Sequence, residues 1–449
     1  MEIILNEIVR AGNQIKFEHL NMSGNDLSDF CPEQVASAIC QSRIVQITNT
    51  GVDPLKLFKH VITDNFTVIE EIHMNGSFTH VPVELFHGTL SRMKKIFFED
   101  ITELTEFQFE SLVEISRILD AKIAINLRSV ATIKPIFAGM FYLKKITINV
   151  EDYNHLSAMD WNAVMECSAH RDSKLTDLTI DAGFEGLDLT QLSPKILSGA
   201  FSKLECLCLA STKMSKEQYE AIFKTISVSK LELYMLNLNG VDPEAMTMAL
   251  SRCKTLSMEY VALTHPQWER FLSFLISASS VAKIKLSNVD LSFISEEPLT
   301  SLISKCSSVD LSLSRLTSDQ VTKILKKVCE KDNMHNLNLS HIDLSTVPET
   351  IIARALINVT RVGLNKTKLT NNQMLSLLVA NLGRSKLRTL DLSYINLSKV
   401  NYQMKPTFYT AFGFTTTGLK FYYFTGLILI LNAIYFKVEG RCLQLQSCT

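Results

Sequence analysis

One nine-residue phrase occurs four times near the end of the chain, and it restricts the fold more than any other feature. The copies are VDLSLSRLT, LNLSHIDLS, VGLNKTKLT and LDLSYINLS, and their first residues, called anchors below, are Val309, Leu337, Val362 and Leu390. Side chains alternate along a strand, so the anchor and the residue two positions later share one face. A single segment cannot bury that face alone. A period of about 26 residues therefore predicts stacked strand–helix segments, that is, a solenoid.

The pattern continues towards the N-terminus with less regular spacing. Earlier anchors are Leu20, Val45, Ile72, Ile96, Ile123, Ile146, Leu178, Leu207, Leu231, Leu256 and Ile284. With the four clear copies they make about 15 segments, and we expect irregular connections from Ile72 to Ile96 and from Leu178 to Leu207. The residue seven positions after the anchor is also apolar and is expected to face the same interior, as at Leu316, Leu344, Leu369 and Leu397.

Two alternating signals predict where the helix of each segment begins. In every second segment a Ser or Thr precedes a Gln or Asp by three positions, which is the pattern of a capping box. These hydroxyl residues are Thr105, Ser157, Ser215, Thr264, Thr317 and Thr370. The other segments carry a proline at the first helical position, where a residue without N–H is tolerated: Pro32, Pro82, Pro135, Pro194, Pro243, Pro298 and Pro348. The underlying period is therefore a pair of segments, about 53 residues long.

This alternation resembles the ribonuclease-inhibitor-like superfamily of leucine-rich repeats, over roughly residues 1–400. The resemblance implies an α/β solenoid: a leucine-rich-repeat horseshoe with a parallel concave sheet, convex helices and about 15 repeats. The chain departs from the family five positions after the anchor, where the family usually has Asn or Cys. Here Thr or Ser alternates with Leu, Val or Ile. The loop geometry is therefore expected to differ, since turn amides must find other partners.

The pattern ends after residue 400, so we divide the sequence into a leucine-rich-repeat solenoid at 1–400 and an apolar tail at 401–449. Residues 407–436 are aromatic and apolar, but the uninterrupted stretch 421–436 is shorter than a membrane-crossing helix needs. Three interpretations stay open: a short C-terminal membrane anchor, an irregular cap over the last repeat, or a non-native end. The chain also opens in mid-repeat, which favours the repeat portion of a larger protein.

Charge and motifs argue against several classes of function. The formal net charge is −1, so no long-range field favours nucleic acid or an acidic membrane. Motifs typical of nucleotide binding, serine hydrolases and metalloproteases are absent from the sequence. We therefore expect no enzyme activity, cofactor or metal. The ten cysteines form no CxxC pair, and the start of the chain lacks a signal-peptide pattern, which favours a cytoplasmic location. A C-terminally membrane-anchored form is the alternative.

The predicted binding surface is the concave strand face. The position after each anchor is polar or small and mixed in charge, which suits a protein partner. It lacks the stripe of Arg and Lys with stacked aromatics that nucleic acid needs. The candidate protein-binding residues are Lys95, Phe97, Glu99, Glu232, Tyr234, Lys283, Lys285 and Asp310.

The sequence therefore favours a non-enzymatic scaffold that binds a protein partner of unidentified kind on a concave leucine-rich-repeat surface. The resemblance also implies a possible role as a sensing or autoinhibitory region of an immune-receptor-like protein. Two alternatives are a leucine-rich-repeat regulator of a small GTPase and a membrane-tethered repeat receptor. The membrane-tethered form would use residues 407–436.

Overall fold

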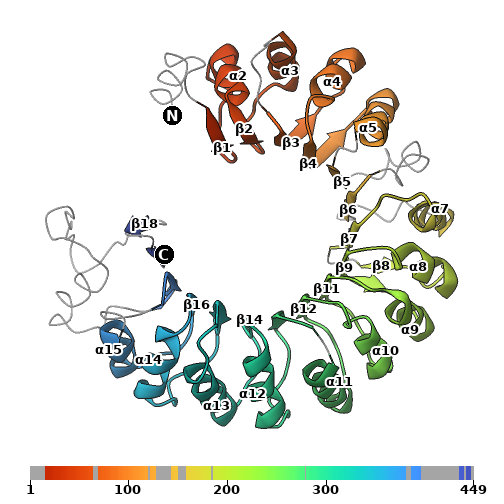
Figure 1. Cartoon of the computed structure of the whole chain (residues 1–449). Helices are drawn as coiled ribbons and strands as arrows, with labels where there is room; N and C mark the ends of the chain where they lie inside the picture. The colour runs from red at the N-terminus through yellow and green to blue at the C-terminus, as the bar shows by residue number, and fades with distance from the viewer. Residues whose placement is uncertain are drawn as a thin grey trace, which may run out of the picture. The chain divides into compact units, whose positions relative to one another are not determined.

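The computed structural model describes residues 16–63, 69–119, 122–127, 143–149, 158–183, 186–278, 280–380, 386–395, 434–438 and 441–445. Within them the chain is an α/β protein whose strands alternate with helices and pair in parallel, apart from one C-terminal hairpin. It divides into two compact units, residues 1–228 and 229–449. We call them the N-terminal unit and the C-terminal unit. In each, strands lie on one side and helices on the other (Figure 1).

The N-terminal unit contains one row of parallel strands. In pairing order these are β1 (Phe17–Asn21), β2 (Ser42–Gln46), β3 (Glu71–Ser77), β4 (Lys95–Glu103), β5 (Lys122–Leu127), β6 (Lys145–Asn149), β7 (Asp177–Asp181) and β9 (Cys206–Ala210). Its helices are α2 (Pro32–Cys40), α3 (Pro54–Thr63), α4 (Val83–Leu90), α5 (Glu106–Leu119), α7 (Ala158–Ala169), α8 (Pro194–Phe201) and α9 (Lys216–Thr225). A two-stranded parallel sheet joins β8 (Leu187–Asp188) to β10 (Thr212–Lys213).

The C-terminal unit has the same arrangement. Its strands are β11 (Lys230–Tyr234), β12 (Thr255–Glu259), β13 (Lys283–Ser287), β14 (Ser308–Asp310), β15 (Asn336–Asn338), β16 (Arg361–Gly363) and β17 (Thr389–Asp391). Its helices are α10 (Pro243–Met248), α11 (His265–Ala278), α12 (Glu296–Lys305), α13 (Ser318–Cys329), α14 (Glu349–Ile357) and α15 (Asn371–Ala380).

Most of the apolar tail lies outside the described residues, and so does most of the stretch 407–436, for which a membrane anchor was one of three interpretations. Of residues 401–449 the structure describes only β18 (Ile434–Val438) and β19 (Arg441–Leu445). These two strands form an antiparallel hairpin, and β19 pairs in parallel with β17. Among the helices that the structure describes, none is both long enough and apolar enough to cross a membrane.

The anchors of the C-terminal unit lie directly beside one another in the sheet. Each pairs with the next and is at most 2% exposed: Leu231, Leu256, Ile284, Val309, Leu337, Val362 and Leu390. In the N-terminal unit the order breaks once, because Ile146 pairs with Ile125 and not with the expected anchor Ile123. A displacement of two residues keeps the alternation of the two strands in phase, because strand side chains alternate with period two.

Burial seven positions after the anchor alternates from segment to segment, so the expectation that all these residues face the interior is wrong in part. Leu344, in a proline segment, is fully buried, whereas Leu316 and Leu369 are only half-buried. Each of the last two directly precedes the capping hydroxyl of its helix. That is the place of a residue packing against the first helical turn from outside. Leu397 lies outside the described residues.

The predicted capping boxes form. The Gln320 N–H donates to Thr317 Oγ1 at 3.2 Å, and the Thr317 N–H donates to Gln320 Oε1 at 2.7 Å. The same reciprocal bonds occur at Thr105, Ser215 and Thr370. At Thr264 one of the two bonds is present, in which the Thr264 N–H donates to Gln267 Oε1. Ser157 is outside the described residues.

The same glutamines also connect each segment to the one before it. Gln320 Nε2 donates to the carbonyls of Leu291 at 2.8 Å and Ile294 at 2.6 Å. Equivalent pairs of bonds are made by Gln108, Gln218, Gln267 and Gln373. All five side chains are buried. One side chain therefore closes its own helix start and satisfies two carbonyls of the preceding proline segment.

The prolines fall within or just before the first helical turn, but not all at its first position. The expectation of a proline at the first helical position is confirmed for Pro32, Pro194 and Pro243. Pro82 and Pro348 instead immediately precede their helices, and Pro298 is the third residue of α12. All these places are compatible with a missing N–H, because the first-turn N–H groups have no partner within the helix. Pro135 lies outside the described residues.

Candidate protein-binding surface

The candidate residues fall on two separate surfaces, one in each unit. On β4, Lys95 donates to Glu71 at 2.6 Å, and the Phe97 ring stacks on His73 with centroids 4.2 Å apart. Burial acts to raise the pKa of Glu71, but hydrogen bonds from Lys95 and His73 outweigh it and lower that pKa. Glu99 belongs to β4, but its side chain is outside the described residues.

Charged residues at the amino-terminal ends of the first strands neutralise one another. Arg43 lies 2.7 Å from Glu18 on one side and 3.1 Å from Glu70 on the other, and Lys94 is 2.9 Å from Glu70. Hydrogen bonds from Lys94 and Arg43 lower the pKa of Glu70. This edge of the N-terminal unit is thus an acid–base ladder, which we call the charge ladder: Glu18, Arg43, Glu70 and Lys94.

In the C-terminal unit, Glu232, Lys285 and Asp310 occupy the same position on β11, β13 and β14, one residue past the anchor. Among the described residues no ion pair joins these three side chains to one another, and Glu232 and Lys285 pair with other neighbours. Glu232 pairs with Lys230 at 3.0 Å, and Lys285 pairs with Glu259 at 2.7 Å.

Asp310 and Tyr234 also find partners on the strand face. Asn338 Nδ2 donates to Asp310 Oδ2 at 3.0 Å. The ring of Tyr234 packs edge-on against Tyr260, with centroids 5.4 Å apart. Lys283 is exposed and has no ion-pair partner among the described residues. Sequence reasoning therefore placed these residues on one face but missed Glu259 and Tyr260, which complete the contacts.

A row of residues in left-handed backbone conformation follows the strands, four positions after the anchors. Their φ values lie between 51° and 66°. They are Asn49, Ser211, Met235, Tyr260, Asn288, Leu313, His341, Lys366 and Tyr394. Bulky residues rarely adopt this conformation, so each costs on the order of 1 kcal/mol and is held there by its surroundings.

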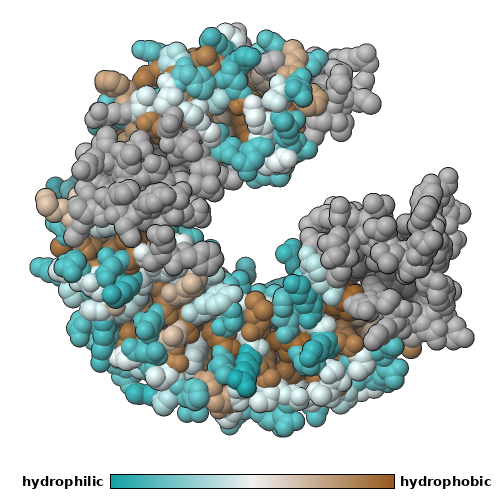
Figure 2. Space-filling model, turned by 180° about the vertical axis from the view of Figure 1, so that it is seen from behind, coloured by the Kyte–Doolittle hydropathy of each residue, from teal (hydrophilic) through white to brown (hydrophobic). Residues whose placement is uncertain are grey.

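Four of these residues combine strain with an exposed apolar side chain. Met235, Tyr260, Leu313 and Tyr394 are between 36% and 45% exposed, and all belong to the C-terminal unit. We call them the apolar row. Lys366 lies 4.9 Å from the ring centroid of Tyr394, which adds a cation–π contact at one end. Figure 2 shows hydrophilic side chains interspersed with hydrophobic ones over the visible surface.

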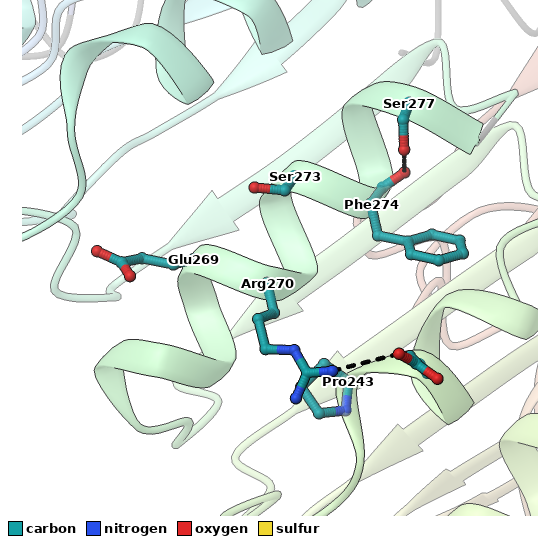
Figure 3. A pocket seen from close by; sticks show the side chains of 7 residues that line it. Pro243, Glu269, Arg270, Ser273, Phe274 and Ser277 are labelled. Carbon is teal, nitrogen blue, oxygen red and sulfur yellow. Dashed lines mark hydrogen bonds and ion pairs between the residues drawn. The ribbon is translucent and has the colours of Figure 1, made fainter.

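A shallow pocket lies on the helix side of the C-terminal unit, between α10 and α11 (Figure 3). Arg270 reaches across it to Glu244 at 3.2 Å, while Glu269 and Ser273 point away from this ion pair. α10 has 6 residues and α11 has 14, so α11 extends beyond α10. Phe274, on α11, is 39% exposed. The lining offers one paired arginine and no nucleophile beside a base, so it does not support a catalytic role.

Other chemically active side chains are buried or scattered. Burial raises the pKa of the Cys253 and Cys306 thiols to about 11, which makes them poor nucleophiles. Within the described ranges, no three His, Cys, Asp or Glu side chains gather as a metal site requires. Trp161 and Trp268 are 3% and 2% exposed and belong to the core. Compared with known proteins, the chain matches no protein-family model and no curated protein.

Proposed function

We propose that the strand–helix segments form a leucine-rich-repeat solenoid of the ribonuclease-inhibitor-like kind. Three observations support this proposal: the anchors pair in register, helix starts alternate between capping boxes and prolines, and buried glutamines bridge successive segments. Each segment then contacts mainly its neighbours, as solenoid segments do.

The proposed function is that of a non-enzymatic, cytoplasmic scaffold that binds a protein partner on the strand face of the C-terminal unit. The observation that carries it is the apolar row at the carboxyl ends of β11, β12, β14 and β17. Tyrosine and methionine are enriched where proteins bind one another. The backbone of these residues is held in one conformation before binding, so little backbone freedom is lost on binding, which favours affinity.

The charged residues beside the apolar row suit a specific interface. Glu232, Glu259 and Lys285 already hold ion pairs within the face, so a partner meets an ordered surface of both signs. Such surfaces contribute to the choice of partner and to its orientation more than to affinity.

The test compares two variants with matched loss of apolar surface. Tyr260→Asn/Leu313→Asn removes the centre of the row, and asparagine tolerates the left-handed conformation, so the fold is expected to persist. The control, Met248→Gln/Phe274→Gln, removes two exposed apolar residues from the helix side. Quantitative capture from cell extract should identify proteins lost by the first variant and retained by the second, and calorimetry with the purified protein should reproduce that order. Identical captured sets would reject the strand face as the binding surface.

A further inference from the structure

Four exposed cations lie at the amino-terminal ends of strands in the C-terminal unit. Lys283 and Arg361 begin β13 and β16, while Lys254 and Arg388 directly precede β12 and β17. In the part of the chain that the structure describes, no carboxylate lies within ion-pair distance of any of them. We call these four residues the basic edge.

The strands that carry the basic edge belong to one row, in which β14 and β15 separate Lys283 from Arg361 and begin with Ser308 and Asn336. Backbone hydrogen bonds connect its members strand by strand: Lys283 N to Lys254 O, Ser307 N to Ala282 O, His335 N to Ser307 O, Arg361 N to His335 O and Arg388 N to Thr360 O, all between 2.7 and 3.0 Å. Neighbouring strands lie about 4.8 Å apart. Five such steps place Lys254 and Arg388 about 24 Å apart.

The charge ladder of the N-terminal unit shows that this excess is not a requirement of the fold. There the corresponding ends of the strands carry Glu18, Arg43, Glu70 and Lys94, which neutralise one another. In the C-terminal unit Lys230, on the strand before the basic edge, has such a partner, Glu232. Unpaired charges of one sign repel one another. A ligand of opposite charge would remove that repulsion.

We infer that the basic edge binds an acidic, extended segment of a polypeptide, which deepens and rests on the proposed function. An extended chain advances about 3.3 Å per residue, so about 24 Å corresponds to seven or eight residues. Carboxylates of the segment pair with Lys254 and Lys283 at one end and, in bidentate fashion, with Arg361 and Arg388 at the other.

The residues between and beside the cations favour a polypeptide over nucleic acid. Thr255, Ser308, Asn336 and Thr389 offer hydroxyl and amide groups to a peptide main chain, and His335 is the one ring among the described residues at these strand starts on which a base could stack. Asp310 and Asp391 lie two positions further along β14 and β17. A narrow peptide can avoid them, whereas a duplex, with a charge on each phosphate, would bring negative charge against them.

The test uses a fluorescein-labelled octaglutamate peptide as the probe and fluorescence anisotropy as the readout. Lys283→Glu/Arg361→Glu reverses one cation in each half of the basic edge. The control, Lys326→Glu/Arg354→Glu, makes the same charge change at exposed positions of α13 and α14. We expect the basic-edge variant to bind the peptide at least about tenfold more weakly than the wild type, and the control to bind it as the wild type does. The affinity of the wild type should decrease when the salt concentration is raised from about 0.05 M to about 0.3 M.

Three results would overturn the inference. The first is that octaglutamate does not bind to the wild type. The second is that the control substitutions weaken binding as much as the basic-edge substitutions, because the attraction would then be nonspecific. The third is that an octathymidylate oligonucleotide binds more tightly than octaglutamate and that the basic-edge variant loses this binding. Circular dichroism of each variant verifies that it is folded. The proposed function is tested separately at Tyr260 and Leu313, so it can survive the failure of this inference.

Discussion

The side-chain amide of Asn338 lies over the Cα of Gly363 on the next strand. A Cβ at residue 363 would come 2.9 Å from Asn338 Cγ, too close for non-bonded carbons. The amide is fixed there, because Nδ2 donates to Asp310 and Oδ1 accepts from the Ser340 N–H at 3.1 Å. The glycine thus allows an amide bridge to Asp310 across neighbouring strands.

Substituting Gly363→Ala is therefore expected to lower the free energy of unfolding by about 1–2 kcal/mol. The reason is that the added methyl must displace Asn338 from its bonds. In the background of Asn338→Ala the same substitution should cost less, since the clashing amide is gone. Urea unfolding of the two single variants and the double variant measures this coupling. Strict additivity would contradict the contact.

Gln320→Leu is expected to lower the free energy of unfolding by about 2–4 kcal/mol. The leucine leaves the buried carbonyls of Leu291 and Ile294 without donors and opens one half of the capping box. Urea denaturation followed by circular dichroism provides the measurement. Lys326→Ala, at an exposed position of the same helix, is the control and should change stability by less than about 0.5 kcal/mol. Equal effects of the two substitutions would show that the bridge is unimportant.

Asp188 is expected to make the stability of the folded chain depend on pH in the acid range. Hydrogen bonds from the Thr190 hydroxyl and N–H, together with Lys213, lower the pKa of Asp188 from 3.8 to about 2. Its ionised form therefore contributes stability that is fully present above pH 3.8 and is lost as the pH falls towards 2.

The stability difference between the wild type and Asp188→Asn should accordingly stay constant down to about pH 5 and then close towards about pH 2. The midpoints of urea unfolding over this pH range measure the stability difference. Asparagine is the chosen replacement because its side-chain oxygen can still accept from Thr190, so that only the charge is removed. A difference that does not change with pH would contradict the lowered pKa.

Leu313 should tolerate glycine better than valine. Its φ of 61° suits glycine, whereas a β-branched side chain is strongly disfavoured there. Leu313 is 44% exposed, so little buried contact is lost in either case. We expect Leu313→Gly to exceed Leu313→Val in unfolding free energy by about 2 kcal/mol. Thermal melts and urea curves of the pair provide the test, and a more stable valine variant would speak against the left-handed conformation.

Local spacing was sufficient to predict much of the fold. Thr317 and Gln320 are three residues apart, so their capping box depends on one helical turn and can be predicted from that turn alone. The bridge from Gln320 to Ile294 could not be predicted, because it depends on how two segments stack. The displaced pairing of Ile146 with Ile125 depends in the same way on neighbouring strands.

The candidate surface was only partly predictable for a related reason. Alternation along a strand places Glu232 and Lys285 on one face, as observed. The apolar row comes after the strand, where alternation gives no guidance. A signal was nevertheless present: the chain uses Gly24 and Gly76 four positions after their anchors, both with positive φ. A glycine there indicates a positive φ, which Tyr260 also has.

The glutamine bridges have a consequence for how the length of this chain can change during evolution. The carbonyls come from a segment that starts its helix with proline, and the glutamine comes from the one that follows. Deleting or duplicating one segment would join two of the same kind and leave a glutamine or a pair of carbonyls without its counterpart. Gain or loss of two adjacent segments preserves every bridge, so viable insertions and deletions should come in even numbers.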